Sequence, residues 1–231
     1  MAIDTTRIQA ICFDVDGTLS DTDDLCVEKL THILQPIQFL FPAKNATRLA
    51  RWIIMEMEAP GNFLIGLTDV VGFDDEIYAF VDRMARSSHS RLRENKIIPG
   101  VREMLVELKG HYPLAVVSAR DENTTRHFLD SWELTQFFHC IATAQTCEHT
   151  KPYPDPIIWA AQKMDIPPEA CLMVGDTTVD IRAGKSAGAQ TAGVLCGFGG
   201  RNELERRRAD IILDTTSELV ELLKPGWAQP A

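Results

Sequence analysis

Between residues 98 and 223 the chain alternates strand-like and helix-like segments, and this alternation limits its possible folds more than any other feature. Short apolar runs predict buried strands, and the stretches between them carry apolar residues at helical spacing. Strands that alternate with helices pair in parallel and are covered by helices on both faces. We therefore predict an α/β fold with a three-layer Rossmann-like core. The expected strands are Leu114–Ser118, Phe138–Ala142, Ala170–Asp176, Thr191–Leu195 and Ile211–Leu213.

The helices expected between these strands have recognisable ends. One begins at Pro99-Gly100, and Asp121 is a plausible N-cap for the next. The others are expected over Pro154–Met164, Asp180–Ala187 and Ser217–Leu223.

Residues 21–97 interrupt the alternation with helical spacing and almost no strand pattern. We expect an inserted all-helical cap domain at 21–97, with residues 1–20 and 98–231 forming the catalytic core. Because both connections leave the first strand's end, such a cap would cover a crevice there.

The first strand leads into two carboxylates. Residues 11–13 are apolar, Asp14 and Asp16 follow two positions apart, and Gly17-Thr18 ends the run. Ligand crevices of open α/β sheets lie at the carboxyl ends of strands. Carboxylates crowded there repel one another unless a cation or a proton intervenes. A hard divalent cation with oxygen ligands, such as Mg²⁺, is the natural solution.

Three later features lie just beyond other apolar runs. Ser118 ends the second strand, and Lys151 stands in Lys-Pro-Tyr-Pro-Asp-Pro before a helix. Gly175-Asp176 and Asp180 follow the fourth strand. Each residue alone has an ordinary structural explanation: a strand-end hydroxyl, a solvated lysine, a turn residue, or an N-cap for Asp180. Their common order on successive strand ends favours a single site.

This set of motifs resembles the haloacid dehalogenase superfamily, whose motifs are Asp-x-Asp-Gly-Thr, a strand-end Ser or Thr, a Lys, and Gly-Asp-x-x-x-Asp. The order of elements from residue 8 to about 213 is similar to that fold, including a helical cap after the first motif. The Lys-Pro-x-Pro-Asp-Pro stretch and Ala209-Asp210-Ile211-Ile212 look most like the phosphoglycolate phosphatase-like branch. Ser118-Ala119-Arg120 departs from the Thr-Asn-Lys usual in that branch.

The resemblance implies a Mg²⁺-dependent phosphatase that acts on small phosphorylated metabolites, either phosphoglycolate-like compounds or sugar phosphates. Asp14 is the expected nucleophile, since a carboxylate can form an aspartyl-phosphate that water then opens. Asp16 is the expected acid and then base. Asp14 and Asp176 would hold Mg²⁺, and the resemblance adds the backbone carbonyl of Asp16.

The remaining site residues would bind the phosphoryl group or support those that do. Lys151 supplies positive charge to the phosphate and to Asp14 and is counted with the catalytic residues. Ser118 and the backbone N–H groups that follow it, beginning at Ala119, donate hydrogen bonds to the transferring group. Asp180 would orient Lys151 or a water on the metal. For Arg120, contact with phosphate and a surface ion pair stay equally open.

Two other functions remain alternatives. A phosphomutase of the same family would return the phosphoryl group to a second hydroxyl of the substrate. A non-catalytic phospholigand-binding protein is expected to lack one of the motifs, and all four are present.

The composition of the chain limits the kinds of partner and the cellular location that we expect. A net charge of −10 argues against sequence-independent binding to nucleic acid or acidic membranes, which needs a basic surface. The six cysteines are scattered without a Cys-x-x-Cys pair, which favours reduced thiols. With no apolar leader at Met1–Arg7 and no run of membrane-spanning length, a cytoplasmic location is expected. The sequence does not indicate an oligomeric state.

Overall fold

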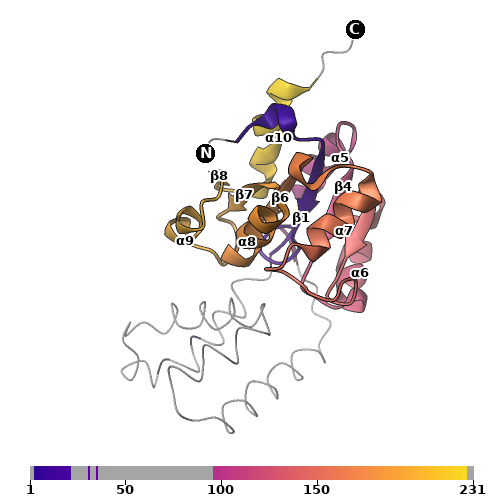
Figure 1. Ribbon diagram of the computed structural model, residues 1–231. Helices are drawn as coiled ribbons and strands as arrows, with labels where there is room; N and C mark the ends of the chain where they lie inside the picture. Colours follow the sequence, from indigo (N-terminus) through magenta and orange to yellow (C-terminus); the bar gives the residue numbers. More distant parts are fainter. Residues whose placement is uncertain (1–2, 22–30, 32–34, 36–95, 228–231) are drawn as a thin grey trace.

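The computed structural model describes residues 3–21, 31, 35 and 96–227 (Figure 1). The proposed division into a core and a cap at 21–97 therefore stays a prediction, because nearly all of that segment lies outside the described residues.

The core is built on a parallel six-stranded sheet in the order β5-β4-β1-β6-β7-β8. Its central strands have both faces buried, which explains their continuous apolar runs. This confirms the predicted α/β fold with a parallel sheet. The strands are β1 Ala10–Phe13, β4 Leu114–Val117, β5 Cys140–Ala142, β6 Cys171–Gly175, β7 Gln190–Val194 and β8 Ile211–Leu213.

Six α-helices of the described part follow or precede these strands: α5 Val101–Lys109, α6 Glu122–Ser131, α7 Asp155–Met164, α8 Thr178–Ala187, α9 Arg201–Arg206 and α10 Leu219–Leu223. Short 3₁₀ turns are η1 Thr5–Arg7, η3 Thr135–Phe137, η4 Pro168–Ala170, η5 Thr216–Glu218 and η6 Lys224–Gly226. The N-cap prediction for α6 is confirmed, since the Asp121 carboxylate accepts the Thr124 N–H at 3.0 Å. No helix within the described ranges combines the length and apolar character needed to cross a bilayer.

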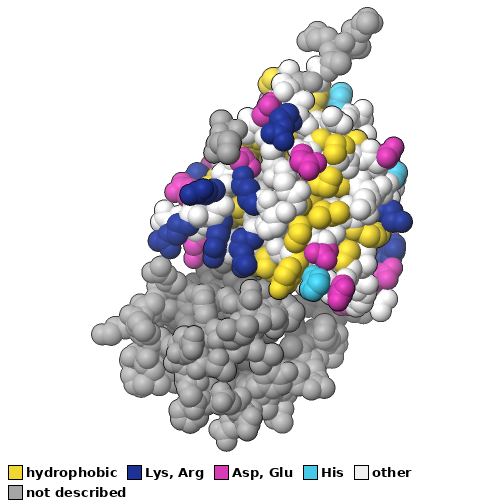
Figure 2. All heavy atoms as spheres, in the orientation of Figure 1, with side chains coloured by type: hydrophobic (Ala, Val, Ile, Leu, Met, Phe, Trp, Pro, Cys, Tyr) yellow, Lys and Arg dark blue, Asp and Glu magenta, His cyan; other side chains and the backbone are white. Residues whose placement is uncertain are grey.

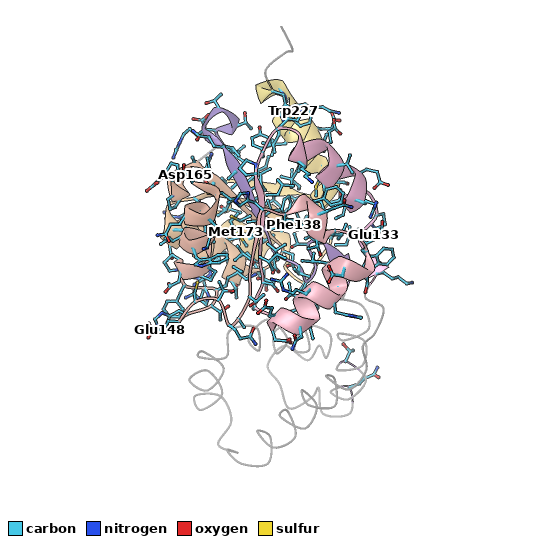
Figure 3. The ribbon with its side chains drawn as sticks, turned by 90° about the vertical axis from the view of Figure 1, so that its right-hand side faces the viewer. Glu133, Phe138, Glu148, Asp165, Met173 and Trp227 are labelled. Carbon is cyan, nitrogen blue, oxygen red and sulfur yellow. The ribbon has the colours of Figure 1, made fainter. Side chains whose placement is uncertain are left out.

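Alternate side chains of each central strand point to opposite faces of the sheet and pack into two apolar layers. In β1, Cys12 faces the layer formed with α7 and α8, whereas Phe13 faces the layer formed with α5, α6 and α10. Figure 1 shows α7 and α8 in front of the sheet. Met173 and Phe138 lie near the centre of the molecule in Figure 3, and Phe138 meets Phe13 edge to face with 6.4 Å between ring centroids. This three-layer arrangement matches the prediction.

Two short strands join the segment 22–95 to the core. Strand β2 (Ser20–Asp21) pairs antiparallel with β3 (Lys96–Ile97), and the Ile98 N–H donates to the Leu19 carbonyl at 3.0 Å. The two connections of that segment therefore lie side by side, immediately after the loop that follows β1. The sequence did not predict this two-stranded ribbon.

Charge is unevenly distributed over the surface. Figure 2 shows Lys and Arg side chains gathered on the part of the surface where Figure 1 labels α8 and α9. Lys185 of α8 forms an ion pair with Asp210, and Arg201 of α9 forms one with Asp214. A basic region thus exists on a chain whose net charge is −10.

Candidate active site

Three of the predicted site residues follow directly after neighbouring strands. Asp14 comes after β1, Ser118 after β4 and Asp176 after β6. Phe13 is level with Val116 of β4 and Val174 of β6, and the Asp14 N–H donates to the Val174 carbonyl at 2.9 Å. The parallel pairing therefore brings all three to the same edge of the sheet, as predicted.

Lys151 connects two carboxylates at this edge. Its Nζ donates to Asp14 Oδ1 and to Asp180 Oδ1, both at 2.6 Å, and all three side chains are buried. Buried charges of this kind need partners, because each loses its hydration. The structure thus brings together Lys151, Asp14 and Asp180, three residues that the sequence assigned to one site.

The pKa values of this cluster follow from burial and mutual attraction. Burial raises the pKa of Asp14 to about 7, in spite of the opposing effect of Lys151. Burial alone would lower the pKa of Lys151, but Asp14 and Asp180 outweigh it and raise the pKa above its ordinary value. Lys151 is therefore a permanent cation beside Asp14 at neutral pH.

Asp180 is fixed by the helix on which it stands. Helix α8 begins with Thr177 as its N-cap and Asp180 at the third helical position, in a reciprocal capping box. Asp180 Oδ2 accepts the Thr177 N–H at 3.0 Å and the Thr177 hydroxyl at 2.7 Å. The N-cap explanation weighed for Asp180 is therefore wrong, since Thr177 occupies that position. Both oxygens of Asp180 have donors, which suits it to hold Lys151 in place.

Asp176 lies among closely packed backbone. Its Oδ2 accepts the Phe198 N–H at 2.7 Å, and its Oδ1 is 3.4 Å from the Thr18 hydroxyl. A Cβ added to Gly17, whose φ is +69°, or to Gly197 would lie 2.3 or 2.2 Å from Asp176 Oδ2. Only glycine fits at these two positions. The loop containing Phe198 was not assigned to the site, although its glycines at 197, 199 and 200 are a visible signal of close backbone approach.

Three carboxylates could hold a cation here. Asp14, Asp176 and Asp180 are buried, and one oxygen of each lies within 4.8 Å of the others. Against these three negative charges Lys151 supplies one positive charge. An all-oxygen set with excess negative charge fits a hard divalent cation.

Asp16 forms an ion pair with Arg120, a partner that the sequence did not identify. It lies beyond the end of β1, in the loop where the Val15 carbonyl accepts the N–H groups of Leu19 and Ser20. Its carboxylate is bound by the guanidinium of Arg120, with Nε paired to Oδ2 and Nη2 to Oδ1. The side chain of Asp16 is therefore engaged apart from the Asp14–Asp176–Asp180 cluster.

The loop after β4 provides the remaining predicted residues. Ser118 is buried, and its Oγ accepts the Arg120 N–H at 3.1 Å; Ala119, between them, is half-buried. The Arg120 guanidinium also lies over the Phe128 ring of α6, 5.8 Å from its centroid. The structure shows Arg120 in an ion pair that joins the loops that follow β1 and β4, although this pair is partly shielded from water and does not lie on the surface as that alternative supposed.

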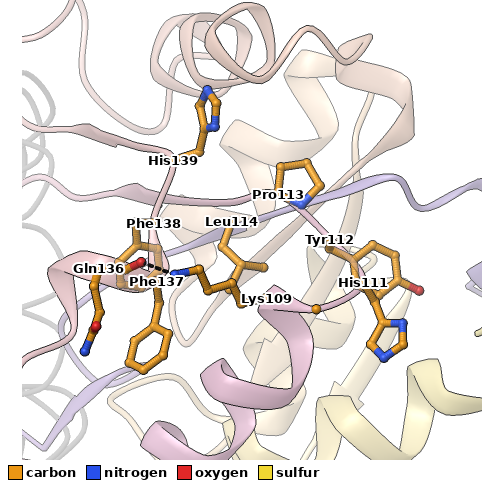
Figure 4. Close-up of a pocket in the computed structure, with 10 residues that line it drawn as sticks. Lys109, His111, Tyr112, Pro113, Leu114, Gln136, Phe137, Phe138 and His139 are labelled. Carbon is orange, nitrogen blue, oxygen red and sulfur yellow. Dashed lines mark hydrogen bonds between the residues drawn. The ribbon is translucent and has the colours of Figure 1, made fainter.

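A pocket lies at the end of the sheet opposite to Asp14, Ser118 and Asp176 (Figure 4). It is formed by the end of α5 and the segments that precede β4 and β5, and Lys109 Nζ there donates to the Gln136 carbonyl at 2.5 Å. It contains none of the predicted site residues.

Comparisons with known proteins identify the family of the chain. The sequence profile of the family described as haloacid dehalogenase-like hydrolase matches residues 11–194. "Pyrophosphatase PpaX" from Anoxybacillus flavithermus is 33% identical over 219 residues, which cover 94% of this chain and 97% of that protein.

Solved structures show the same fold. A protein described as a predicted phosphoglycolate phosphatase from Haemophilus somnus has a TM-score of 0.64 and 21% identity, covering 94% of this chain and 98% of that chain. A β-phosphoglucomutase from Clostridium difficile has a TM-score of 0.64 and 22% identity, covering 95% of this chain and 96% of that chain. The profile match and the relative that is 33% identical confirm the predicted family and, with it, the predicted kind of enzyme, a phosphatase-type hydrolase. The site geometry and the sequence match together show that the chain belongs to the haloacid dehalogenase-like hydrolase family.

Proposed function

We propose that this hydrolase is a Mg²⁺-dependent phosphatase that cleaves small phosphorylated metabolites through an aspartyl-phosphate on Asp14. One observation carries the proposal: a buried carboxylate at the end of the central strand is held 2.6 Å from a buried lysine, beside two further carboxylates. A phosphoryl group carries its negative charge on its equatorial oxygens, and it needs a nucleophile together with nearby positive charge.

The first half of the reaction transfers the phosphoryl group to the protein. A carboxylate oxygen of Asp14 forms a bond to phosphorus while the bond to the leaving oxygen breaks. Asp16, in its acid form, gives a proton to that leaving oxygen, so the alcohol departs neutral. Lys151 keeps its positive charge beside Asp14 and the incoming phosphoryl group.

The second half restores the enzyme. Asp16, now a carboxylate, takes a proton from a water molecule whose oxygen attacks phosphorus. The bond from Asp14 to phosphorus breaks, inorganic phosphate leaves, and Asp16 is again an acid. The Ser118 hydroxyl and the Ala119 N–H are proposed to donate hydrogen bonds to the phosphoryl oxygens in both halves.

The donor set suits Mg²⁺. Asp14 and Asp176 are the proposed side-chain ligands, together with the backbone carbonyl of Asp16, whereas Asp180 is proposed to hold Lys151, whose Nζ donates to its Oδ1 at 2.6 Å. When bound, Mg²⁺ would neutralise charge on the transferring phosphoryl group.

Two observations favour specific substrates or outcomes. The name of the relative that is 33% identical makes pyrophosphate a candidate substrate beside phosphoglycolate-like compounds and sugar phosphates. The likeness to a β-phosphoglucomutase keeps the phosphomutase alternative, in which the phosphoryl group returns to a second hydroxyl.

A substrate panel tests the proposal. Phosphoglycolate, pyrophosphate, sugar monophosphates and nucleotides are incubated with the protein and Mg²⁺, and inorganic phosphate is measured. We expect release from at least one compound and its loss in EDTA. Isomerisation of a sugar phosphate with little phosphate released would establish the mutase instead, and no reaction with any compound would contradict both enzymatic functions.

A further inference from the structure

We propose that Arg120 determines specificity: it holds the Asp16 carboxylate in an ion pair that a second negative group on the substrate must displace. The inference rests on the proposed function of Asp16 as acid and base. It adds the class of substrate that the site favours, namely phosphate esters or anhydrides whose leaving group carries its own negative charge close to the broken bond.

The ion pair occupies the whole carboxylate. Arg120 Nε is paired with one oxygen of Asp16 and Nη2 with the other, in the two-pronged geometry that a planar guanidinium makes with carboxylates. The pair is partly shielded from water, with side-chain exposures of 16% for Arg120 and 21% for Asp16. Shielding strengthens the attraction relative to a surface pair.

Arg120 is held in position by more than Asp16. Its backbone N–H donates to Ser118 Oγ at 3.1 Å, and its guanidinium lies 5.8 Å from the centre of the Phe128 ring. These contacts of its backbone and of its guanidinium face keep the positive charge of Arg120 at the edge of the site when the Asp16 carboxylate moves away.

This pairing has a consequence for catalysis. Both oxygens of Asp16 are paired with Arg120, so turning the carboxylate toward the leaving oxygen of a substrate breaks at least one of these two contacts. Asp16 must therefore separate from Arg120 before it can exchange a proton with that oxygen. An uncharged leaving group provides no anion to pair with the guanidinium after Asp16 has separated from it. A carboxylate or a phosphate on the leaving group can take the place of Asp16 in the ion pair.

The position of the second charge follows from the contact itself. The guanidinium lies within hydrogen-bond distance of the carboxylate that must reach the leaving oxygen. A negative group that displaces Asp16 is consequently only a few bonds from the broken phosphorus–oxygen bond. Phosphoglycolate and pyrophosphate meet this requirement, and a phosphate ester of a neutral alcohol does not.

A matched pair of substrates tests the inference. Phosphoglycolate and 2-hydroxyethyl phosphate are similar in size and differ in a carboxylate against a hydroxymethyl group. Steady-state kcat and KM for both are measured with Mg²⁺ for the wild type, Arg120→Met and Arg120→Lys. Arg126→Met is the control, since Arg126 is an exposed arginine on α6 that forms a surface ion pair with Glu122.

Opposite changes on the two substrates are the expected result. Arg120→Met should lower kcat/KM for phosphoglycolate by about 10- to 100-fold, mainly through KM, which corresponds to one lost charge-assisted interaction. The same variant should raise kcat for 2-hydroxyethyl phosphate, because Asp16 is no longer held. Arg120→Lys keeps the charge but not the two-pronged geometry, so its kinetic constants should lie between those of the wild type and those of Arg120→Met. Arg126→Met should resemble the wild type.

Binding provides a readout separate from turnover. Calorimetry with Mg²⁺ compares methylenediphosphonate with methylphosphonate, which has a single anionic group. The wild type should prefer the first and Arg120→Met should lose most of that preference. The inference would be overturned if Arg120→Met lowered kcat/KM equally for both esters. It would also be overturned if Arg120→Met kept the wild-type preference in both the kinetic and the binding assay. Wild-type protein that releases phosphate from none of the compounds in the substrate panel, while Arg120 still governs the binding preference, would instead contradict the proposed function.

Discussion

At the scale of single residues, the stability of the site depends on the pairing of buried charges. Lys151 lies between Asp14 and Asp180, and each of the two contacts measures 2.6 Å. Removing the cation would leave two carboxylates facing each other without hydration. Loss of one partner from a buried ion pair costs about 3–5 kcal/mol.

Lys151→Met should therefore lower the free energy of unfolding by about 3 kcal/mol in the absence of metal, as measured by urea denaturation. The loss should shrink as the pH falls, because protonation of Asp14 removes its negative charge; burial already raises the pKa of Asp14 to about 7 with Lys151 present, and removal of this cation should raise the pKa further. Lys163→Met is the control, because Lys163 is exposed on α7 and should change stability by less than about 0.5 kcal/mol. An unfolding curve for Lys151→Met that coincides with the wild type would contradict the buried cluster.

The motifs predicted the place of Asp14, Lys151 and Asp176 because each sits at a fixed distance from a buried strand or a helix start. They did not predict the Asp16–Arg120 pair. These residues are 104 positions apart, and both lie in loops whose side-chain directions depend on tertiary contacts. Carboxylates two positions apart point to the same side only in a strand, and β1 ends at Phe13.

At the scale of secondary structure, burial on both faces made the central strands predictable. Short elements were not: β2 and β3 have two residues each and carry no periodicity. The strand expected from Phe138 begins only at Cys140. The 3₁₀ turn η3 ends just before Phe138, and an apolar run alone does not separate a turn from a strand.

One carboxylate adds contacts beside the pairing of β7 with β8. Asp210 accepts the Thr191 N–H at 2.8 Å and the Thr191 hydroxyl at 3.0 Å, and it forms an ion pair with Lys185. Burial alone would raise the pKa of Asp210, but the hydrogen bonds from Lys185 and Thr191 outweigh it and lower the pKa below its ordinary value.

Asp210→Ala should reduce the free energy of unfolding at neutral pH by about 1–3 kcal/mol, since it leaves buried donors unsatisfied. A carboxyl group with a lowered folded-state pKa stabilises the fold above its ordinary pKa of 3.8, and this contribution is lost as the pH falls through the folded-state pKa. The difference between variant and wild type should therefore shrink in acid. If the difference in the free energy of unfolding between Asp210→Ala and the wild type stayed constant down to pH 2, the charge of Asp210 would not contribute to stability.

At the scale of the whole molecule, strand order explains where the site lies. From β1 the chain proceeds outward to β4 and β5, then crosses to β6, β7 and β8 on the other side. The direction of winding reverses around β1, and open α/β sheets bind ligands at such a point. The sequence predicted the parallel sheet but not its strand order, which depends on crossings between distant segments.

Metal binding should stabilise the fold as a whole, because a cation held by Asp14 and Asp176 binds only the folded chain. Thermal unfolding followed by fluorescence should show a Tm that rises with Mg²⁺ concentration. The rise should disappear in Asp176→Asn and persist in Asp155→Asn, which changes a half-exposed carboxylate on α7. Equal shifts in both variants would place the cation elsewhere.

The proposed function depends above all on the attack of Asp14 on phosphorus. Its most direct test is the rate of phosphate release by Asp14→Asn with Mg²⁺, measured on the best substrate of the wild type. Asparagine has the shape of aspartate but lacks the nucleophilic carboxylate, so the fold should persist while kcat falls by more than about a thousandfold. Asp165→Asn, at an exposed helix end, is the matched control and should keep the wild-type rate. A folded Asp14→Asn protein that releases phosphate at nearly the wild-type rate would contradict the account.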